Sequence, residues 1–161
     1  MLADIQPRLA VDDDVDAIAI LSRDLIEHGM PWGWQSARVR KCIKASDTNV
    51  VAAGPKGSPV GFGIMKYQDD EAHLLLFAVA TNHQRRGIGS SLLLWLEDVA
   101  RIAGARRVQV EARRENEAAR CFYNEHGYHE WALERGMYRA AVDGVHLEKW
   151  LVQVSPKAGD A

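Results

Sequence analysis

Residues 72–104 read AHLLLFAVATNHQRRGIGSSLLLWLEDVARIAG, an apolar run followed by a basic glycine turn and then by an amphipathic pattern. The run from Leu74 to Val79 predicts a buried strand. Apolar residues recur at helical spacing from Ile88 to Ala103, and Gly104 follows where a left-handed cap would end a helix. The sequence therefore predicts a strand–turn–helix unit around which the rest of the chain is organised.

The turn of this unit has the composition of an anion site. Gly87 and Gly89 allow a sharp bend, and the helix that follows adds unpaired N–H groups and a positive dipole end. Arg85 and Arg86 precede the glycines, Ser90 lies in the first helical turn, and residues 72–96 contain no carboxylate. These features favour a phosphate ligand over a plain connection. The stretch matches neither the Rossmann fingerprint nor the P-loop.

Composition limits the remaining possibilities. The chain has 161 residues, 47% of them apolar and 26% charged, which suits one soluble globular domain. Its net charge of −2 gives no general attraction to nucleic acid or to anionic membranes. Cys42 and Cys121 lack the spacing of a zinc site or a disulfide framework. We expect a cytoplasmic protein without a nucleic-acid or membrane partner, and either a monomer or a homodimer.

The periodicity of the whole chain predicts one α+β domain, residues 1–154, with a frayed tail at residues 155–161. The last two predicted strands form an antiparallel pair joined by a turn near Asp143-Gly144. Gly61 and Gly63 indicate a bulge or a close backbone approach. The predicted helices are Val15–Glu27, Gln35–Lys44, Ile88–Ala103 and Glu117–Glu125. The predicted strands are Ile5–Leu9, Val50–Ala53, Pro59–Tyr67, Leu74–Val79, Arg107–Ala112, Tyr128–Leu133 and His146–Val152.

A second informative stretch runs from Glu111 to Tyr128. Asn116 and Tyr123 are seven residues apart, so a helix places them on nearly the same face, about 10 Å apart along its axis. One extended ligand can contact both. Taken alone, the pattern favours a simpler interpretation, in which Asn116 is an N-cap and Tyr123 is a half-buried aromatic residue.

Two motifs resemble the GNAT superfamily of N-acyltransferases. The turn QRRGIG matches the Q/R-x-x-G-x-G/A loop that binds acyl-CoA in that family, and Asn116 is followed by A-x-x-x-x-Y and by Gly127-Tyr128. VEARREN resembles the LEVR-x-x-N stretch of ribosomal-protein alanine N-acetyltransferases. The resemblance implies a central mixed, mostly antiparallel twisted sheet flanked by helices, with acetyl-CoA as cofactor and no metal.

The same resemblance implies roles for individual residues. Tyr123 would protonate the departing thiolate, Glu111 would be the general base and Asn116 would contact the pantetheine arm. The residues that it assigns to acetyl-CoA are Phe77, Val79, Gln84, Arg85, Arg86, Gly87, Ile88, Gly89, Ser90, Asn116 and Tyr123. Transfer of an acetyl group to an amine requires these two proton transfers in any case, and backbone N–H groups near Phe77 to Val79 can polarise the carbonyl if the strands splay.

Other bases remain open. Glu71 and His73 lie at the start of the Leu74 strand, and strict alternation would put His73 on the same face as Leu75 and Phe77. We rank Glu111 ahead of both. Cys121 has no nearby partner to deprotonate it, so direct transfer in a ternary complex is preferred to a covalent acyl-enzyme.

The acceptor is the least defined part. The family takes its substrate specificity from the segment after the first helix and from the last hairpin, here residues 29–45 and 135–146. The candidate acceptor residues are His28, Trp32, Trp34, His73 and Tyr138. On a mobile loop the two tryptophans would line a slot or, more simply, cover the open end of the core. The predicted function is N-acetylation of a primary amine of a small molecule or peptide. The alternatives are another acyl-CoA, a catalytically silent acyl-CoA sensor, and a nucleotide-binding protein.

Overall fold

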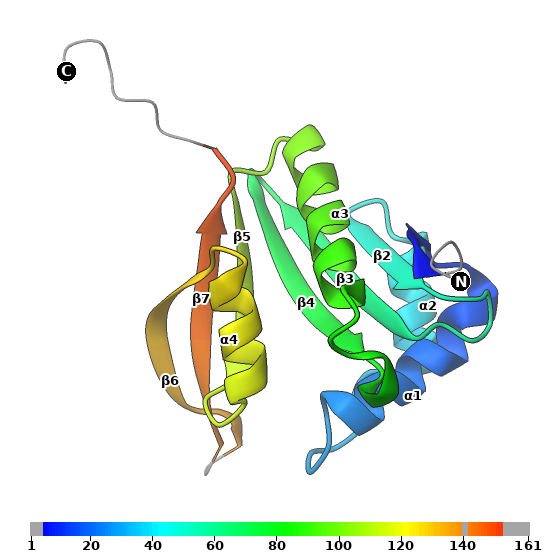
Figure 1. Cartoon of the computed structure of the whole chain (residues 1–161), viewed down its shortest axis with the longest axis horizontal. Coiled ribbons are helices and arrows are strands. Elements are labelled where there is room, and N and C mark those ends of the chain that lie inside the picture. The colour runs from blue at the N-terminus through cyan, green and yellow to red at the C-terminus, as the bar shows by residue number, and fades with distance from the viewer. Residues whose placement is uncertain (1–4, 140–141, 153–161) are drawn as a thin grey trace.

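The computed structural model describes residues 5–139 and 142–152. Over these residues the chain forms one seven-stranded sheet covered by helices (Figure 1). The strands are β1 (Pro7–Leu9), β2 (Thr48–Ala53), β3 (Gly61–Gln68), β4 (Glu71–Val79), β5 (Arg107–Arg113), β6 (His129–Arg139) and β7 (Val142–Trp150). The helices are α1 (Val15–Leu25), α2 (Ser36–Lys44), α3 (Ile88–Ile102) and α4 (Glu117–Glu125). None of the helices in the described ranges is long and apolar enough to cross a membrane.

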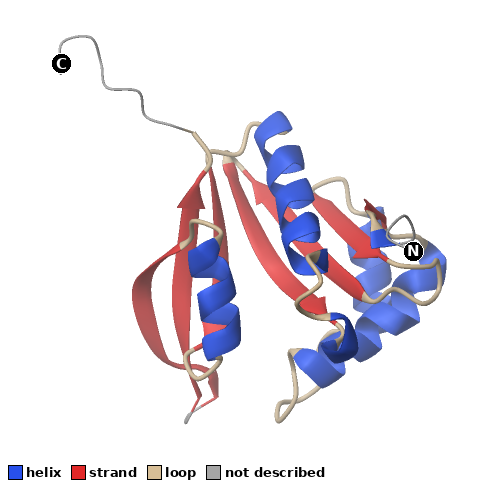
Figure 2. Cartoon of the chain, in the orientation of Figure 1, coloured by secondary structure: helices blue, strands red, loops and turns tan. Residues whose placement is uncertain are grey.

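The sheet has the order β1-β2-β3-β4-β5-β7-β6. All neighbouring strands are antiparallel except β4 and β5, which are parallel. Helices α3 and α4 lie in front of the sheet and α1 and α2 lie behind it (Figure 2). The two layers have separate buried clusters, one formed with α3 and α4 and the other with α1 and α2. The predicted mixed, mostly antiparallel sheet flanked by helices is confirmed.

The parallel pair β4–β5 separates part-way along its length. Pairing runs only from Glu71 opposite Arg107 to Leu74 opposite Val110, although β4 continues to Val79. The two strands diverge visibly from that point (Figure 1). Beyond Leu74, therefore, the edge of β4 that faces β5 has no neighbouring strand to bond with, within the described residues.

A β-bulge at the same point changes the faces of β4. Ile64 of β3 pairs with Leu76 and Met65 pairs with Leu74, which leaves Leu75 as an extra residue. Leu74 packs in the α3–α4 layer, whereas Leu75 and Leu76 pack in the α1–α2 layer. Phe77 then returns to the α3–α4 layer. The prediction that His73, Leu75 and Phe77 share one face is therefore wrong for Phe77.

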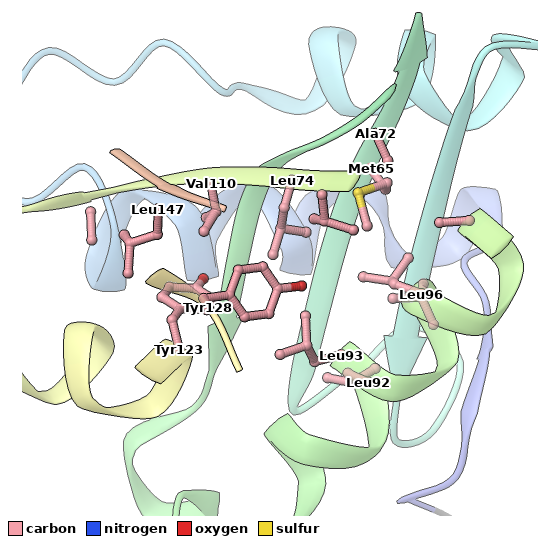
Figure 3. Packing of buried hydrophobic residues seen from close by; sticks show 14 of the residues in the cluster. Met65, Ala72, Leu74, Leu92, Leu93, Leu96, Val110, Tyr123, Tyr128 and Leu147 are labelled. Carbon is pink, nitrogen blue, oxygen red and sulfur yellow. The ribbon is translucent and has the colours of Figure 1, made fainter. Parts of the chain in front are cut away.

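Helix α3 packs tightly on the front of the sheet. Its buried residues Leu92, Leu93 and Leu96 are fully covered, and they pack near Met65 and Leu74 (Figure 3). A Cβ at Gly63 would lie 2.8 Å from Leu96 Cδ1, which explains why β3 has a glycine there. The close approach predicted from the two β3 glycines is thus confirmed, and the helix is pressed against the strand.

The last hairpin differs from the prediction in its turn. Strands β6 and β7 pair from His129 opposite Glu148 to Arg139 opposite Val142, so Asp143 and Gly144 lie inside β7. Gly144 is there because a Cβ would meet the Met137 sulfur and would lie 2.9 Å from a ring carbon of Tyr138. The predicted tail at residues 155–161 lies outside the described residues.

Candidate active site

The glycine turn connects β4 to α3 through two left-handed residues. Arg85 has φ +62° and Gly87, the N-cap of α3, has φ +83°. The amide of Gln84 folds back and donates to the carbonyl of Val79 at 2.9 Å, which closes the turn onto the end of β4. Arg85 and Arg86 are exposed. The turn therefore presents two exposed cations beside the backbone bend.

The first turn of α3 supplies backbone donors to the same place. The first bond of the helix runs from the Ser91 N–H to the Gly87 carbonyl at 3.0 Å, and Gly87 provides no side-chain cap. The N–H groups of Ile88, Gly89 and Ser90 precede that bond, so they are the open donors of the helix start. Open N–H groups, the positive end of the helix dipole and the arginines are the features that favour an anion at this position.

The start of α3 rests on α4. A Cβ at Gly89 would lie 3.2 Å from the ring of Phe122, and Phe122 stacks on Phe77 with 5.6 Å between ring centroids. The Ser90 hydroxyl contacts His126 Nε2 at 2.8 Å, while His126 Nδ1 lies 2.7 Å from the carbonyl of Phe122. Because that carbonyl only accepts, Nδ1 carries the proton. Ser90 is therefore engaged by α4.

Helix α4 presents its cap and its tyrosine as predicted. Asn116 Oδ1 accepts the Ala119 N–H at 3.1 Å, and Tyr123 is buried. Burial, reinforced by the proximity of Tyr138 and of the Glu111 carboxylate, raises the pKa of Tyr123 well above that of a free phenol. Within the described residues the Tyr123 hydroxyl makes no hydrogen bond. A neutral phenol with its proton available is the form that a general acid needs.

A cavity of about 100 Å³ opens at the point where β4 and β5 separate. Phe77 and Tyr123 border it from the α3–α4 layer, and Leu25 and Ile26 border it from the end of α1. The other lining residues are His28, Leu74, Leu75, Leu76, Val110, Glu111, Ala112, Arg113, Asn116, Ala119 and Tyr138. The cavity thus connects the two layers through the gap in the sheet.

Glu111 is held by imidazoles at this cavity. His73 Nε2 lies 2.7 and 2.9 Å from the two carboxylate oxygens, and His146 Nδ1 lies 4.0 Å from one of them. His73 itself is absent from the cavity lining, so it supports Glu111 from behind. Tyr138 also faces this charge: burial first, and then Glu111, raise the pKa of Tyr138 to about 12.

The third candidate base is already paired. Glu71 accepts from Arg107 Nε at 2.8 Å and from the Gln109 amide at 2.6 Å, and it does not line the cavity. His146, by contrast, was not singled out from the sequence. The available signal was that His146 alternates with the apolar residues Val145 and Leu147. Alternation puts His146 on the opposite face of the strand, which is the face that carries Glu111.

The segment between α1 and α2 packs against the α1–α2 layer through its two tryptophans. The Trp32 indole N–H donates to the Ala19 carbonyl at 3.1 Å, and both Trp32 and Trp34 pack against the α1–α2 cluster. Neither tryptophan lines the cavity, whereas the predicted acceptor residues His28 and Tyr138 do. An acceptor role for the tryptophans stays a prediction, and their contacts are those of residues that cover the core.

The chain was compared with models of known protein families. Residues 18–128 match the model of the acetyltransferase (GNAT) family. The chain belongs to this family. The match includes the glycine turn, and also β5 and α4, which both border the cavity.

Two relatives within the GNAT family are ribosomal protein bS18-alanine N-acetyltransferases. That of Escherichia coli K12 is 34% identical over 82 residues, 51% of this chain and 55% of that protein. That of Salmonella typhimurium is 31% identical over 120 residues, 71% and 75% of the two chains. Over its match to the first, the chain spans about half the length of the relative. The crystal structure of the PaiA N-acetyltransferase from Thermoplasma acidophilum in complex with coenzyme A shares the fold, with a TM-score of 0.77 at 18% identity over 91% of this chain and 98% of that one.

Proposed function

We propose that this protein is an acetyl-CoA-dependent N-acetyltransferase that transfers the acetyl group directly to a primary amine. The observation that carries the proposal is the cavity at the β4–β5 separation, which borders Tyr123 on one side and Glu111 on the other. A donor and an acceptor approaching from opposite layers can meet there. Direct transfer requires both substrates to be bound together, so initial-rate plots at several acceptor concentrations should intersect rather than run parallel.

The donor side is proposed to bind coenzyme A along α3 and α4. The open N–H groups at Ile88 to Ser90 suit the diphosphate, and Arg85 and Arg86 add charge. Asn116 lines the cavity at the start of α4, where the pantetheine arm would have to pass to reach it. The PaiA structure, which contains coenzyme A, supports this use of the shared fold.

On the acceptor side Glu111 is proposed to accept the proton. Its carboxylate takes one N–H proton of the amine, directly or through one water, as the nitrogen forms its bond to the thioester carbon. His73 holds both carboxylate oxygens and so fixes the direction of the free lone pairs. Backbone N–H groups of β4 beyond Leu74 are available for the carbonyl oxygen, because no strand pairs with that edge.

Tyr123 is proposed to complete the transfer. As the carbon–sulfur bond breaks, the phenol gives its proton to the thiolate sulfur, and the phenolate regains a proton from water afterwards. The raised pKa keeps the phenol protonated at neutral pH. One proton enters at Glu111 and one leaves from Tyr123, so the reaction is balanced without a metal.

The proposed acceptor is the α-amine of a peptide whose first residue is small. The cavity is small, at about 100 Å³. That space suits an amine with an alanine-sized side chain better than a polyamine or an aminoglycoside ring. The relatives that act on an alanine terminus support the same class.

The test is thiol release from acetyl-CoA with a peptide that begins with alanine. Tyr123→Phe should lower kcat by about 10² to 10⁴ with the affinity for coenzyme A unchanged, and Glu111→Gln should lower it by a similar factor. Tyr67→Phe is the matched control, because the Tyr67 hydroxyl contacts Asn49 far from the cavity. If the wild type binds coenzyme A but releases no thiol with any amine, the protein is a sensor and the proposal fails.

A further inference from the structure

The guanidinium of Arg113 joins the end of β5 to the α1–α2 loop at the cavity. Arg113, the last residue of β5, donates through Nη2 to the carbonyls of Ile26 and His28, both at 2.8 Å. These partners are more than 80 residues away in sequence. Arg113, Ile26 and His28 all line the cavity. The contact therefore sits where an acceptor has to enter.

The two carbonyls need such a partner. Helix α1 ends at Leu25 with Ile26 as its C-cap, and no left-handed glycine closes it at that position. The last carbonyls of a helix lack intrahelical donors and carry the negative end of the dipole, so a cation beside the Ile26 carbonyl is favourable. The His28 carbonyl lies in the loop, two residues beyond that cap. Arg113 supplies both the donor and the charge from the other side of the gap.

The loop that follows is closed on itself by a buried carboxylate. Glu27, only 7% exposed, accepts from the Ser22 hydroxyl at 2.8 Å and from the N–H groups of Gly33 and Trp34 at 2.7 and 3.2 Å. The carboxylate thereby ties the end of α1 to the far end of the loop. The loop between α1 and α2 is thus closed by its own hydrogen bonds, and Arg113 links it to β5.

The same guanidinium also contacts the opposite wall. Its central carbon lies 5.8 Å from the ring centroid of Tyr138, which belongs to β6 and lines the cavity. The two segments expected to recognise the acceptor, the α1–α2 loop and the last hairpin, therefore meet at one side chain. A lysine cannot reproduce this set, because it lacks the flat fork that bonds and stacks together.

We propose that Arg113 is a positioning residue that sets the width of the acceptor entrance by holding the α1–α2 loop against β5 and Tyr138. The inference rests on the proposed function, since it assigns this entrance to the acceptor. It predicts that loss of the guanidinium weakens use of the acceptor and leaves use of acetyl-CoA unchanged, because among the described residues the Arg113 side chain has no bond to the glycine turn or to α4. The bond from the Asn116 N–H to the Arg113 carbonyl at the cap of α4 belongs to the backbone, so it remains after substitution.

The kinetic test compares Arg113→Met, Arg113→Lys and Arg114→Met with an alanine-initiated hexapeptide amide as acceptor. Methionine keeps the apolar stem, and the exposed Arg114, whose closest acidic partner is Asp143 at 3.6 Å, is the matched control. Arg113→Met should raise the KM for the peptide about tenfold or more, with the KM for acetyl-CoA within about twofold. The peptide KM of Arg113→Lys should lie between those of Arg113→Met and the wild type, and the peptide KM of Arg114→Met should equal that of the wild type.

A second measurement separates this inference from the proposed function. Hydrogen exchange of the peptide that spans residues 26–34, measured with coenzyme A bound, should be faster in Arg113→Met than in Arg114→Met. Failure of the wild type to acetylate any amine would refute the proposed function alone, because the exchange result does not depend on turnover. Equal peptide KM or equal loop exchange in the two methionine variants would overturn the role of Arg113. Should Arg113→Met not fold, Arg113→Lys gives the same comparison.

Discussion

Replacing Lys149 by methionine tests how the buried carboxylate of Glu97 is tolerated in the core of the α3–α4 layer. Glu97 of α3 has no exposed side-chain surface, and it accepts from the Tyr128 hydroxyl and from Lys149 Nζ, each at 2.8 Å. Tyr128 in turn packs beside Tyr123, with 5.5 Å between ring centroids (Figure 3). The lysine therefore neutralises a charge next to the proposed general acid.

The expected cost follows from this burial. Removing one partner of a buried pair costs about 3–5 kcal/mol, because the other charge is left unpaired. Lys149 is 21% exposed, so we expect the lower end, about 3 kcal/mol. For a chain of this length that corresponds to a fall in Tm of about 6–12 °C. Methionine retains the stem that packs near Gly127, so packing is conserved.

Urea unfolding of a double-mutant cycle measures the coupling. In a Glu97→Gln background the amide is neutral and still accepts from Tyr128, so Lys149→Met should cost less than about 1 kcal/mol there. Lys66→Met, at an exposed position of β3, should cost little in either background. An equal cost of Lys149→Met in both backgrounds would show that the charge of Glu97 is not what Lys149 stabilises.

Three further perturbations address other parts of the molecule. Burial opposes ionisation of Asp14, but hydrogen bonds from Arg8 and two backbone N–H groups lower its pKa. Asp14→Asn should therefore cost about 1.5–3 kcal/mol of unfolding free energy in urea at pH 7. The difference in stability between wild type and variant should vanish as the pH falls through that lowered pKa. All four tyrosine pKa values are raised, chiefly by burial. At about pH 10 the native chain should therefore show little phenolate absorbance, whereas the tyrosines of the urea-denatured chain are about half ionised. The stabilisation that the neutral phenols give to the native state is lost only at higher pH. Gly87→Ala meets no atom within 4 Å but forces alanine to φ +83°, so Tm should fall by about 2–4 °C and calorimetry should show weaker binding of coenzyme A; unchanged affinity would remove this bend from the donor site.

The local signals of the sequence were sufficient for most of the fold. Gly87, Gly104 and Gly127 adopt the left-handed conformation at helix ends, and Asn116 caps α4 as predicted. Each of these depends on a residue type whose backbone preference acts within one turn. Helix α1 ends two residues earlier than predicted, because Glu27 bonds to the loop instead of continuing the helix.

The bulge in β4 could not be predicted in the same way. Leu74, Leu75 and Leu76 are identical, so the sequence gives no reason to place the extra residue at one of them. The register is fixed by β3, where Ile64 and Met65 pair with Leu76 and Leu74. An apolar run without alternation specifies a buried strand but not its register.

The types of residue in the candidate site could be predicted from the sequence, but their spatial arrangement could be predicted only in part. Strand alternation puts Glu111 and His146 on one face, but the contact of His73 with Glu111 joins two strands whose parallel pairing the sequence does not reveal. The bonds of Arg113 to the α1–α2 loop are of the same kind, because they link segments about 85 residues apart. Contacts at such separations depend on the tertiary fold, which local propensity does not encode.

The extra residue at Leu75 changes which side chains of β4 face each layer of the molecule. Before it, the odd-numbered side chains face the α1–α2 layer and the even-numbered ones face the α3–α4 layer. After it, the assignment is exchanged. Variants at 73 and 77, four residues apart on one strand, should therefore be independent of each other, and an engineer can retune the pocket for one reactant through this strand without disturbing the other. Deleting Leu75 would remove the bulge and restore regular alternation, with Leu74, Leu76 and Phe77 each keeping its present layer, so the strand should tolerate that deletion better than the deletion of a residue on either side.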